Sequence, residues 1–132
     1  MIKGQYKYSE LTSKIIGCAM RVHQILGFGF QEVIYQRALA IEMRLANISF
    51  QREFDMPIFF RDEQIGTRRV DFFVEGVISV ELKAIPAFES TNFTQAINYL
   101  EVYNLEIGLL INFGEPGLKF KRLTNKKYKP MI

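Results

Sequence analysis

The sequence predicts an α/β (α+β) fold in which a mixed β-sheet is flanked by helices, in the order ααβββαββ. Three observations lead to this prediction. Apolar residues recur at helical spacing through the first 46 positions, and residues 48–83 are rich in aromatic and β-branched residues. A further helical segment then precedes two short apolar runs. A helix between strands implies a crossover connection, and hence a sheet of mixed direction packed against helices.

The composition fits one compact domain, residues 1–132. Of the 132 residues, 48% are hydrophobic and 23% are charged, which is a globular balance. The single cysteine, Cys18, excludes an intramolecular disulfide and a zinc site built on paired cysteines. The apolar runs are too short to span a bilayer and the N-terminus does not resemble a secretory signal. We therefore expect a soluble cytoplasmic protein with no membrane contact.

Two amphipathic helices are predicted at the start of the chain. The first begins near Ser9, which can cap its N-terminus, and ends at Gly27. Its apolar positions recur at helical spacing: Leu11, Ile15, Cys18, Ala19, Val22, Ile25 and Leu26. The second is predicted over residues 31–46, directly after the glycines at positions 27 and 29. The apolar faces of the two helices should pack together.

Three strands are predicted next, as a meander. Residues 48–60 form the first strand, and the polar segment 61–64 turns the chain into a second strand at residues 65–74. Glu75 and Gly76 turn it again into a third strand at residues 77–83. Consecutive strands joined by tight turns are antiparallel neighbours.

The last third of the chain predicts a helix and two strands. Thr91 or Asn92 can cap a helix that reaches Tyr103. Residues 107–113 and 118–123 then form two short strands.

The positive charge of the chain is concentrated at its end. The net charge is +3, but the six basic residues from Lys119 onward leave eleven basic against fourteen acidic residues in the first 118. A basic tail at residues 124–132 suits contact with a phosphate backbone. A solvated tail that keeps the protein soluble is the alternative, and charge alone does not decide between them.

The third predicted strand contains the strongest chemical signal. Its apolar side chains alternate with Ser79, Glu81 and Lys83, so the two charged side chains share one face. Charged groups in an otherwise apolar strand are costly unless they are paired or functional. Asp71 lies on the preceding strand, and the tight turn between the two strands can bring it close to Glu81.

Two carboxylates that meet at one point bind a hard cation such as Mg²⁺ or Mn²⁺. A lysine beside them can orient or deprotonate an attacking water and offset the charge of a phosphate. The alternative is a structural ion pair between Lys83 and one or both acids, Asp71 and Glu81.

These residues carry a resemblance to a known family. Asp71, followed after nine residues by Glu81-Leu82-Lys83, resembles the motif of the PD-(D/E)XK nuclease superfamily, with Val70 where the superfamily's name has a proline. The segment 29–35, Gly-Phe-Gln-Glu-Val-Ile-Tyr, resembles the signature of its small GxxExxY branch. The flanking segments 23–27 and 111–114 also fit, so the resemblance extends over roughly Ser9 to Leu123.

The resemblance implies a restriction-endonuclease-like core and a role for each matching position. Asp71 and Glu81 are implied as metal ligands, the backbone carbonyl of Leu82 as a third ligand, and Lys83 as the catalytic lysine. Glu32 matches an additional acid that many members contribute to the metal. For Glu32 the alternative is a favourable position at a helix N-terminus, worth about 0.3–1 kcal/mol.

Other residues are implied as supports or substrate contacts. Gln95 and Tyr99 lie four apart on the third helix and match a Gln-x-x-x-Tyr helix of exonuclease-like members. An amphipathic helix with a half-buried Tyr99 is the alternative. Tyr35 should pack and support the site. Arg68 and Arg69 precede Asp71, and since a strand alternates only one can face the site; we assign that role to Arg69.

Two background residues have simpler interpretations. His23 should make a hydrogen bond that holds the glycine loop at residues 27–29, and Cys18 should be a small core residue.

The predicted function is metal-dependent hydrolysis of nucleic-acid phosphodiester bonds, with Mg²⁺ or Mn²⁺ as cofactor and DNA favoured over RNA as substrate. Two alternatives stay open. The chain could be a nuclease-fold module of little or no activity that binds nucleic acid or a protein partner. It could also be a structural oligomer in which Lys83 and the acids form a buried charge network. A homodimer is compatible with so small a domain.

Overall fold

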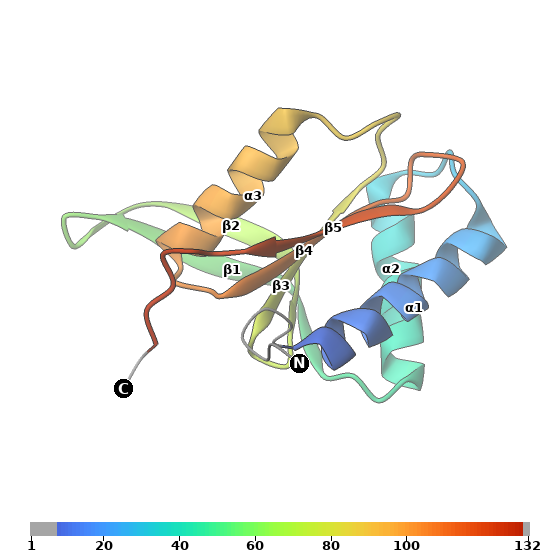
Figure 1. Cartoon of the computed structure of the whole chain (residues 1–132), viewed down its shortest axis with the longest axis horizontal. Helices are drawn as coiled ribbons and strands as arrows, with labels where there is room; N and C mark the ends of the chain where they lie inside the picture. Colours follow the sequence, from blue (N-terminus) through green and yellow to red (C-terminus); the bar gives the residue numbers. More distant parts are fainter. Residues whose placement is uncertain (1–7, 131–132) are drawn as a thin grey trace.

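The computed structural model describes residues 8–130, and the elements within that range follow the predicted order ααβββαββ (Figure 1). The helices and strands are α1 Ser9–Leu26, α2 Glu32–Leu45, β1 Phe50–Phe60, β2 Glu63–Val74, β3 Ile78–Lys83, α3 Ser90–Val102, β4 Ile107–Asn112 and β5 Lys119–Thr124. In the described part of the chain, no helix has the length and apolar character needed to cross a membrane.

The five strands form one mixed sheet in the order β1-β2-β3-β4-β5. All neighbouring pairs are antiparallel except β3 and β4, which run parallel because α3 returns the chain to the same edge before β4 begins. In the parallel pair Glu81 lies beside Leu110 and Lys83 beside Asn112. The predicted fold class is therefore confirmed.

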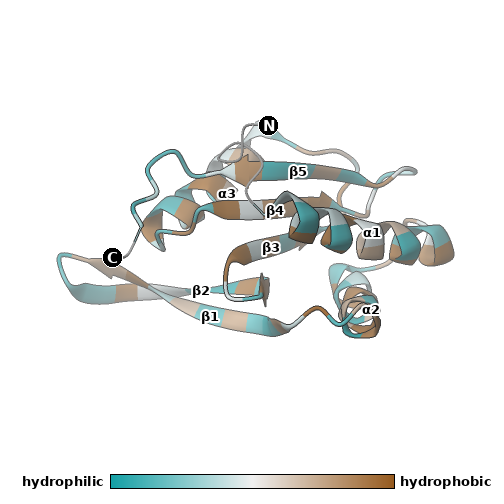
Figure 2. Cartoon of the chain, turned by 60° about the horizontal axis from the view of Figure 1, so that its bottom comes forward, coloured by the Kyte–Doolittle hydropathy of each residue, from teal (hydrophilic) through white to brown (hydrophobic). Residues whose placement is uncertain are grey.

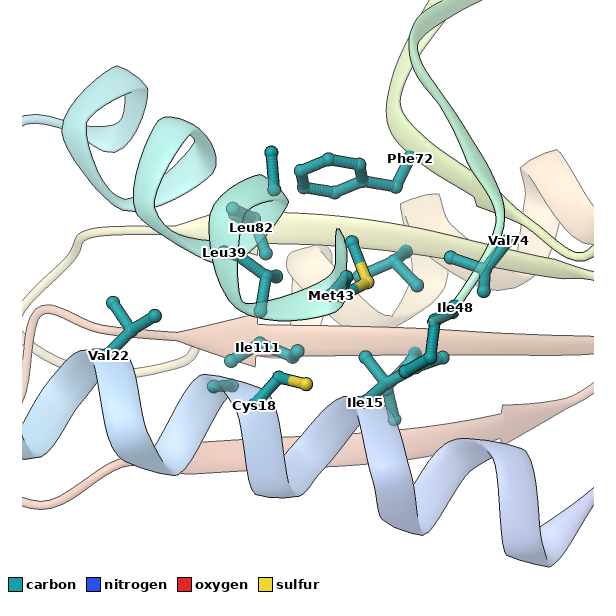
Figure 3. Packing of buried hydrophobic residues seen from close by; sticks show 14 of the residues in the cluster. Ile15, Cys18, Val22, Leu39, Met43, Ile48, Phe72, Val74, Leu82 and Ile111 are labelled. Carbon is teal, nitrogen blue, oxygen red and sulfur yellow. The ribbon is translucent and has the colours of Figure 1, made fainter. Parts of the chain in front are cut away.

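The helices cover opposite faces of this sheet (Figure 1). The larger core lies between the sheet and α1 with α2; Figure 3 shows Cys18 of α1, Met43 of α2 and Phe72 of β2 meeting in it. Cys18 is fully buried there, as predicted. A smaller core lies under α3 and is centred on Leu100 and Leu110. With helices on both faces, all six residues of β4 are buried, which explains its unbroken apolar sequence.

The β1–β2 hairpin extends past the other strands, and its turn is hydrophilic (Figure 2). The turn is shorter than the predicted segment 61–64, since β2 begins at Glu63. Arg61 and Asp62 alone reverse the chain, with φ of 49° and 66°. Two consecutive residues in the left-handed region are the geometry that a two-residue hairpin turn requires.

Both predicted helix caps are wrong by position. Ser9 is the first helical residue of α1, and Tyr8 holds the cap position without a side-chain hydrogen bond. The third helix begins at Ser90, ahead of Thr91, and Asn92 lies in its first turn. The Asn92 side-chain oxygen accepts the backbone N–H of Glu89 at 2.8 Å. Asn92 thus stabilises the helix start from inside the first turn rather than from the cap.

The first part of the predicted basic tail is anchored to the domain. Asn125 is 3% exposed, and its side-chain amide donates to the backbone oxygens of Leu100 and Leu105 at 3.1 and 2.9 Å. Further on, Lys129 exchanges two hydrogen bonds between its backbone and the side chain of Asn104, at 2.7 and 2.9 Å. Residues 125–129 therefore carry their lysines along the body of the protein, and not on a free tail.

The loop after β4 is tied to the end of β3 by a buried asparagine. Asn112 is fully buried, and its side chain donates to the backbone oxygen of Ile85 and accepts the N–H groups of Ile85 and Gly114, at 2.9–3.0 Å. It also donates to the Glu115 carboxylate at 3.0 Å. The segment that follows Lys83 is thereby fixed in place by a side chain from the neighbouring strand.

Candidate active site

The β2–β3 hairpin brings the two predicted carboxylates side by side. Phe72 pairs with Val80 across the antiparallel ladder, which sets Asp71 opposite Glu81 in the continued register. Asp71 Oδ2 accepts the backbone N–H of Leu82 at 2.8 Å, so its side chain is directed at the strand that carries Glu81 and Lys83.

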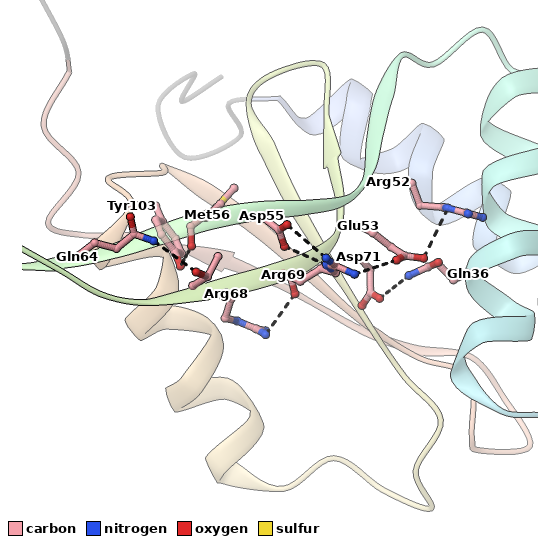
Figure 4. A network of polar contacts seen from close by, with 11 residues as sticks. Gln36, Arg52, Glu53, Asp55, Met56, Gln64, Arg68, Arg69, Asp71 and Tyr103 are labelled. Atoms are coloured by element: carbon pink, nitrogen blue, oxygen red, sulfur yellow. Dashed lines mark hydrogen bonds and ion pairs between the residues drawn. The ribbon is translucent and has the colours of Figure 1, made fainter.

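A residue that the sequence analysis did not single out holds the other oxygen of Asp71. Gln36, from α2, is 7% exposed and donates its side-chain amide to Asp71 Oδ1 at 2.8 Å (Figure 4). Gln36 lies one helical turn after Glu32, and this spacing is the signal that could have identified it. Two donors therefore fix the Asp71 carboxylate, one from β3 and one from α2.

Glu32, Asp71 and Lys83 share one electrostatic environment. Glu32 is the first residue of α2 and is exposed overall. Desolvation raises the pKa of its carboxyl, the ammonium of Lys83 lowers it, and the charge of Asp71 raises it. Glu32 thus occupies the helix start on which its alternative interpretation was based, and its role as an additional metal ligand stays a prediction.

Glu81 is the most perturbed acid of the site. Its side chain is 12% exposed, and it lines a narrow gap with Ala96 and Tyr99 of α3. The pKa of Glu81 is raised from 4.5 to about 7. Burial is the largest cause; the charge of Arg68 opposes it, that of Asp71 adds to it, and that of Lys83 opposes it. A buried carboxylate beside a second carboxylate is held in its charged form only with the help of cations.

Arg68, rather than the expected Arg69, reaches Glu81. Its Nη2 atom lies 2.7 Å from Glu81 Oε1. Arg69 instead pairs with Asp55 at 2.9 Å and with Glu53 at 3.4 Å, both on β1 (Figure 4). The part assigned to Arg69 in substrate binding stays a prediction, while the contact with a site carboxylate belongs to Arg68.

The third helix flanks the site with aromatic side chains. The ring of Tyr99 lies under the Arg68 guanidinium, 3.8 Å from its central carbon. Gln95 is exposed one turn earlier. Tyr103, which was predicted only as the end of this helix, lies one turn later and donates to the backbone oxygen of Met56 at 3.0 Å. Burial raises the pKa of Tyr103, Arg68 lowers it, and two further groups raise it: Tyr99 and Glu81.

Tyr35 supports the loop that leads into Glu32. It is fully buried, its hydroxyl donates to the backbone oxygen of Gly27 at 2.6 Å, and its ring stacks on Phe113 at 4.6 Å. The expectation that the His23 side chain holds this glycine loop is wrong. Its ring Nε2 lies 2.9 Å from the backbone oxygen of Glu115, so His23 holds the loop between β4 and β5 instead. The two residues are 92 positions apart, and no local sequence pattern predicts this contact.

The donor set suits a hard divalent cation in its chemistry. Asp71 and Glu81 offer carboxylate oxygens and Leu82 a backbone carbonyl, which are the ligands that Mg²⁺ and Mn²⁺ prefer. Glu81 Oε1 is buried and lies 2.7 Å from Arg68 Nη2, so a cation at this oxygen would have to displace the guanidinium or share the carboxylate with it. Within residues 8–130, however, the structure contains no cluster of three or more His, Cys, Asp or Glu side chains positioned to bind a metal ion.

The raised pKa of Glu81 predicts how stability changes with pH. Because the folded state binds this proton more tightly than the unfolded state, its contribution is present below pH 4.5 and is lost as the pH rises through about 7. Relative to Glu81→Gln, the wild-type free energy of unfolding should fall by roughly 3 kcal/mol between pH 4 and pH 8. Urea denaturation across this range, without divalent cations, measures the difference.

The control for this experiment is Glu10→Gln, which removes an exposed carboxylate that pairs with Lys14 at 3.7 Å. Its pH profile should follow that of the wild type. A Glu81→Gln profile that also follows the wild type would show that Glu81 is not desolvated as described.

Comparison with known proteins places this arrangement in a family. A family model described as the PD-(D/E)XK nuclease superfamily matches residues 9–123. Among solved structures, the chain is similar to the crystal structure of SSO0001, with 18% sequence identity and a TM-score of 0.54. That similarity covers 93% of this chain but 61% of the other, and it shows a shared fold. No curated protein matches the sequence. The match runs from the start of α1 into β5 and includes the residues from Glu32 to Lys83, and the chain belongs to the PD-(D/E)XK nuclease superfamily.

Proposed function

We propose that this protein is a nuclease of the GxxExxY branch that uses Mg²⁺ or Mn²⁺ to hydrolyse phosphodiester bonds, with DNA as the favoured substrate. The observation that carries the proposal is the convergence of Asp71, Glu81 and Lys83 on one end of the β2–β3 hairpin, in a chain that belongs to a nuclease superfamily. Gly29, Glu32 and Tyr35 occupy the branch signature.

The cation would be held by the carboxylates of Asp71 and Glu81 and the carbonyl of Leu82, with Glu32 as a further acid. Bound there, it would supply Lewis-acid polarisation of the phosphoryl oxygens. The protein's part is to orient the donors: Leu82 N–H and Gln36 hold Asp71, with both hydrogen bonds at 2.8 Å. Orientation by such neighbours is what keeps a ligand ready to bind.

Lys83 would bring the positive charge that the reaction needs. Its ammonium acts on both Glu32 and Glu81, so it lies where a phosphate next to these acids would also meet it. In that position it can hold the attacking water and neutralise the charge that develops on the scissile phosphate. Its backbone is fixed, because its carbonyl accepts the N–H of Phe113 at 2.8 Å. Gln95 and Tyr99 would flank the nucleic acid from α3.

A second candidate is a nuclease-fold module that binds nucleic acid without cutting it. The ion pair between Arg68 and Glu81 favours this candidate, because it already satisfies the charge of one proposed ligand. The two candidates differ in whether the acids bind a divalent cation.

Titration calorimetry of Mg²⁺ and Mn²⁺ at low salt tests the proposal. The wild type should bind the cation, and the Asp71→Ala, Glu81→Ala double variant should not, since it lacks both carboxylate ligands. Circular dichroism of the double variant checks that it is folded. Equal binding by both proteins would place the cation elsewhere, and no binding by the wild type would favour the non-cleaving module.

A further inference from the structure

Arg68 occupies the position of a cation at the proposed ligand Glu81. The two side chains meet at 2.7 Å and are partly buried, with 23% of the Arg68 side chain and 12% of the Glu81 side chain exposed. A partly buried pair is screened less by solvent than the surface pairs of the neighbouring Arg69, whose side chain is 60% exposed. Any ion that binds Glu81 must therefore displace this guanidinium or share the carboxylate with it.

The contact is made by charge and packing, and not by a full set of hydrogen bonds. An arginine that binds a carboxylate firmly donates two parallel hydrogen bonds. Here one nitrogen of Arg68, Nη2, approaches Glu81, and the Nε atom of Arg68 is buried without a hydrogen-bond partner. The guanidinium is thus incompletely satisfied, and the attraction within such a partly buried pair is offset by the desolvation of its two charges.

The ring of Tyr99 gives Arg68 a second partner. The guanidinium carbon lies 3.8 Å from the ring centroid, within the range of a cation–π contact. The guanidinium also donates from Nη1 to the backbone oxygen of Arg69, at 3.5 Å (Figure 4). Because the ring holds the guanidinium independently of the carboxylate, Arg68 can give up Glu81 and still keep a favourable contact.

From these contacts we propose that Arg68 is a built-in counter-ion that competes with a divalent cation for Glu81 and so sets the affinity of the site for metal. This inference rests on the proposed function, because it assumes that Glu81 is a metal ligand. In the absence of metal, Arg68 neutralises Glu81. When metal binds, Arg68 leaves Glu81 and keeps its contact with Tyr99.

Metal affinity of the protein without nucleic acid tests the inference. Titration calorimetry with Mn²⁺ should show that Arg68→Ala binds about tenfold more tightly than the wild type, because a competing positive charge has been removed. Arg68→Lys retains the charge, and its affinity should stay within about threefold of the wild type. Arg69→Ala is the matched control, since it removes the adjacent arginine, which pairs with Asp55 and Glu53 and not with Glu81.

Thermal unfolding gives a second readout that does not depend on activity. Without metal, Arg68→Ala should unfold at a lower temperature than the wild type at pH 8, because Glu81 loses its counter-ion. Addition of Mn²⁺ should raise the unfolding temperature of this variant more than that of the wild type. An equal rise in both proteins would overturn the inference.

The outcomes separate this inference from the proposed function. Unchanged or weaker Mn²⁺ binding by Arg68→Ala would overturn the competing role of Arg68 and leave the metal site standing. Equal gains in Arg68→Ala and Arg69→Ala would also overturn it, as a general effect of net charge. Absence of binding to the wild type and to Arg68→Ala would overturn it together with the metal site, and the cleavage assays below then decide whether the protein is a nuclease.

Discussion

Lys83→Ala should reduce the cleavage rate on DNA by at least about a hundredfold, because it removes the positive charge that stabilises the scissile phosphate in the transition state. The free energy of unfolding should change by no more than about 1 kcal/mol, since a half-buried lysine stem is truncated without leaving a large cavity. Single-turnover cleavage of a labelled DNA measures the first effect, and urea denaturation the second.

Two companion variants sharpen this result. Lys14→Ala removes a lysine whose side chain is 60% exposed and paired with Glu10, and it should cleave at the wild-type rate. Lys83→Arg keeps a positive charge with a different geometry, and it should retain more activity than Lys83→Ala. Wild-type cleavage by Lys83→Ala would remove this residue from the mechanism.

Asn112→Ala should produce the largest loss of stability, about 3–5 kcal/mol. The substitution leaves the N–H and the carbonyl of Ile85 and the N–H of Gly114 without their hydrogen-bond partner. Because Asn112 is fully buried, water does not readily replace it. Gly114 shows how closely these segments approach, because a Cβ there would lie 2.3 Å from the backbone nitrogen of Ile85. Urea denaturation measures the loss.

The control is Asn104→Ala, which also removes two hydrogen bonds to backbone, but at an exposed site on Lys129. Its cost should stay at about 1–2 kcal/mol, because water replaces the lost partners and the main loss is the strain of an alanine at the left-handed φ of 52°. If Asn112→Ala cost no more than Asn104→Ala, the buried network after β3 would not be what fixes the segment that follows Lys83.

The fold could be predicted because its local and global preferences agree. In β3, successive side chains point to opposite faces of the sheet, so Val80 and Leu82 enter the larger core while Glu81 and Lys83 do not. This alternation of apolar and charged residues is visible in the sequence. The change from helical spacing to β-branched and aromatic runs near Asn47 likewise separates the helices from the meander. The helix starts were predicted less well, because several polar residues compete for each cap.

The neighbours of the site acids could not be predicted from local pattern. Gln36 reaches Asp71 across 35 positions, and only the packing of α2 on the sheet shows that they meet. The choice between Arg68 and Arg69 depends on the twist of the β1–β2 ribbon, in which Glu53 adopts a left-handed φ of 53° opposite Asp71. Such a distortion of the ladder changes which side chains face α3, and strict alternation does not anticipate it.

The most direct test of the central claim is cleavage by the wild type on single- and double-stranded DNA and RNA, with Mg²⁺, with Mn²⁺ and with EDTA. We expect products with at least one of the two cations, more from DNA than from RNA, none with EDTA, and none from a folded Asp71→Asn variant. Products of equal yield with EDTA or from Asp71→Asn, or no product from any substrate with either cation, would contradict the assignment of this protein as a metal-dependent nuclease.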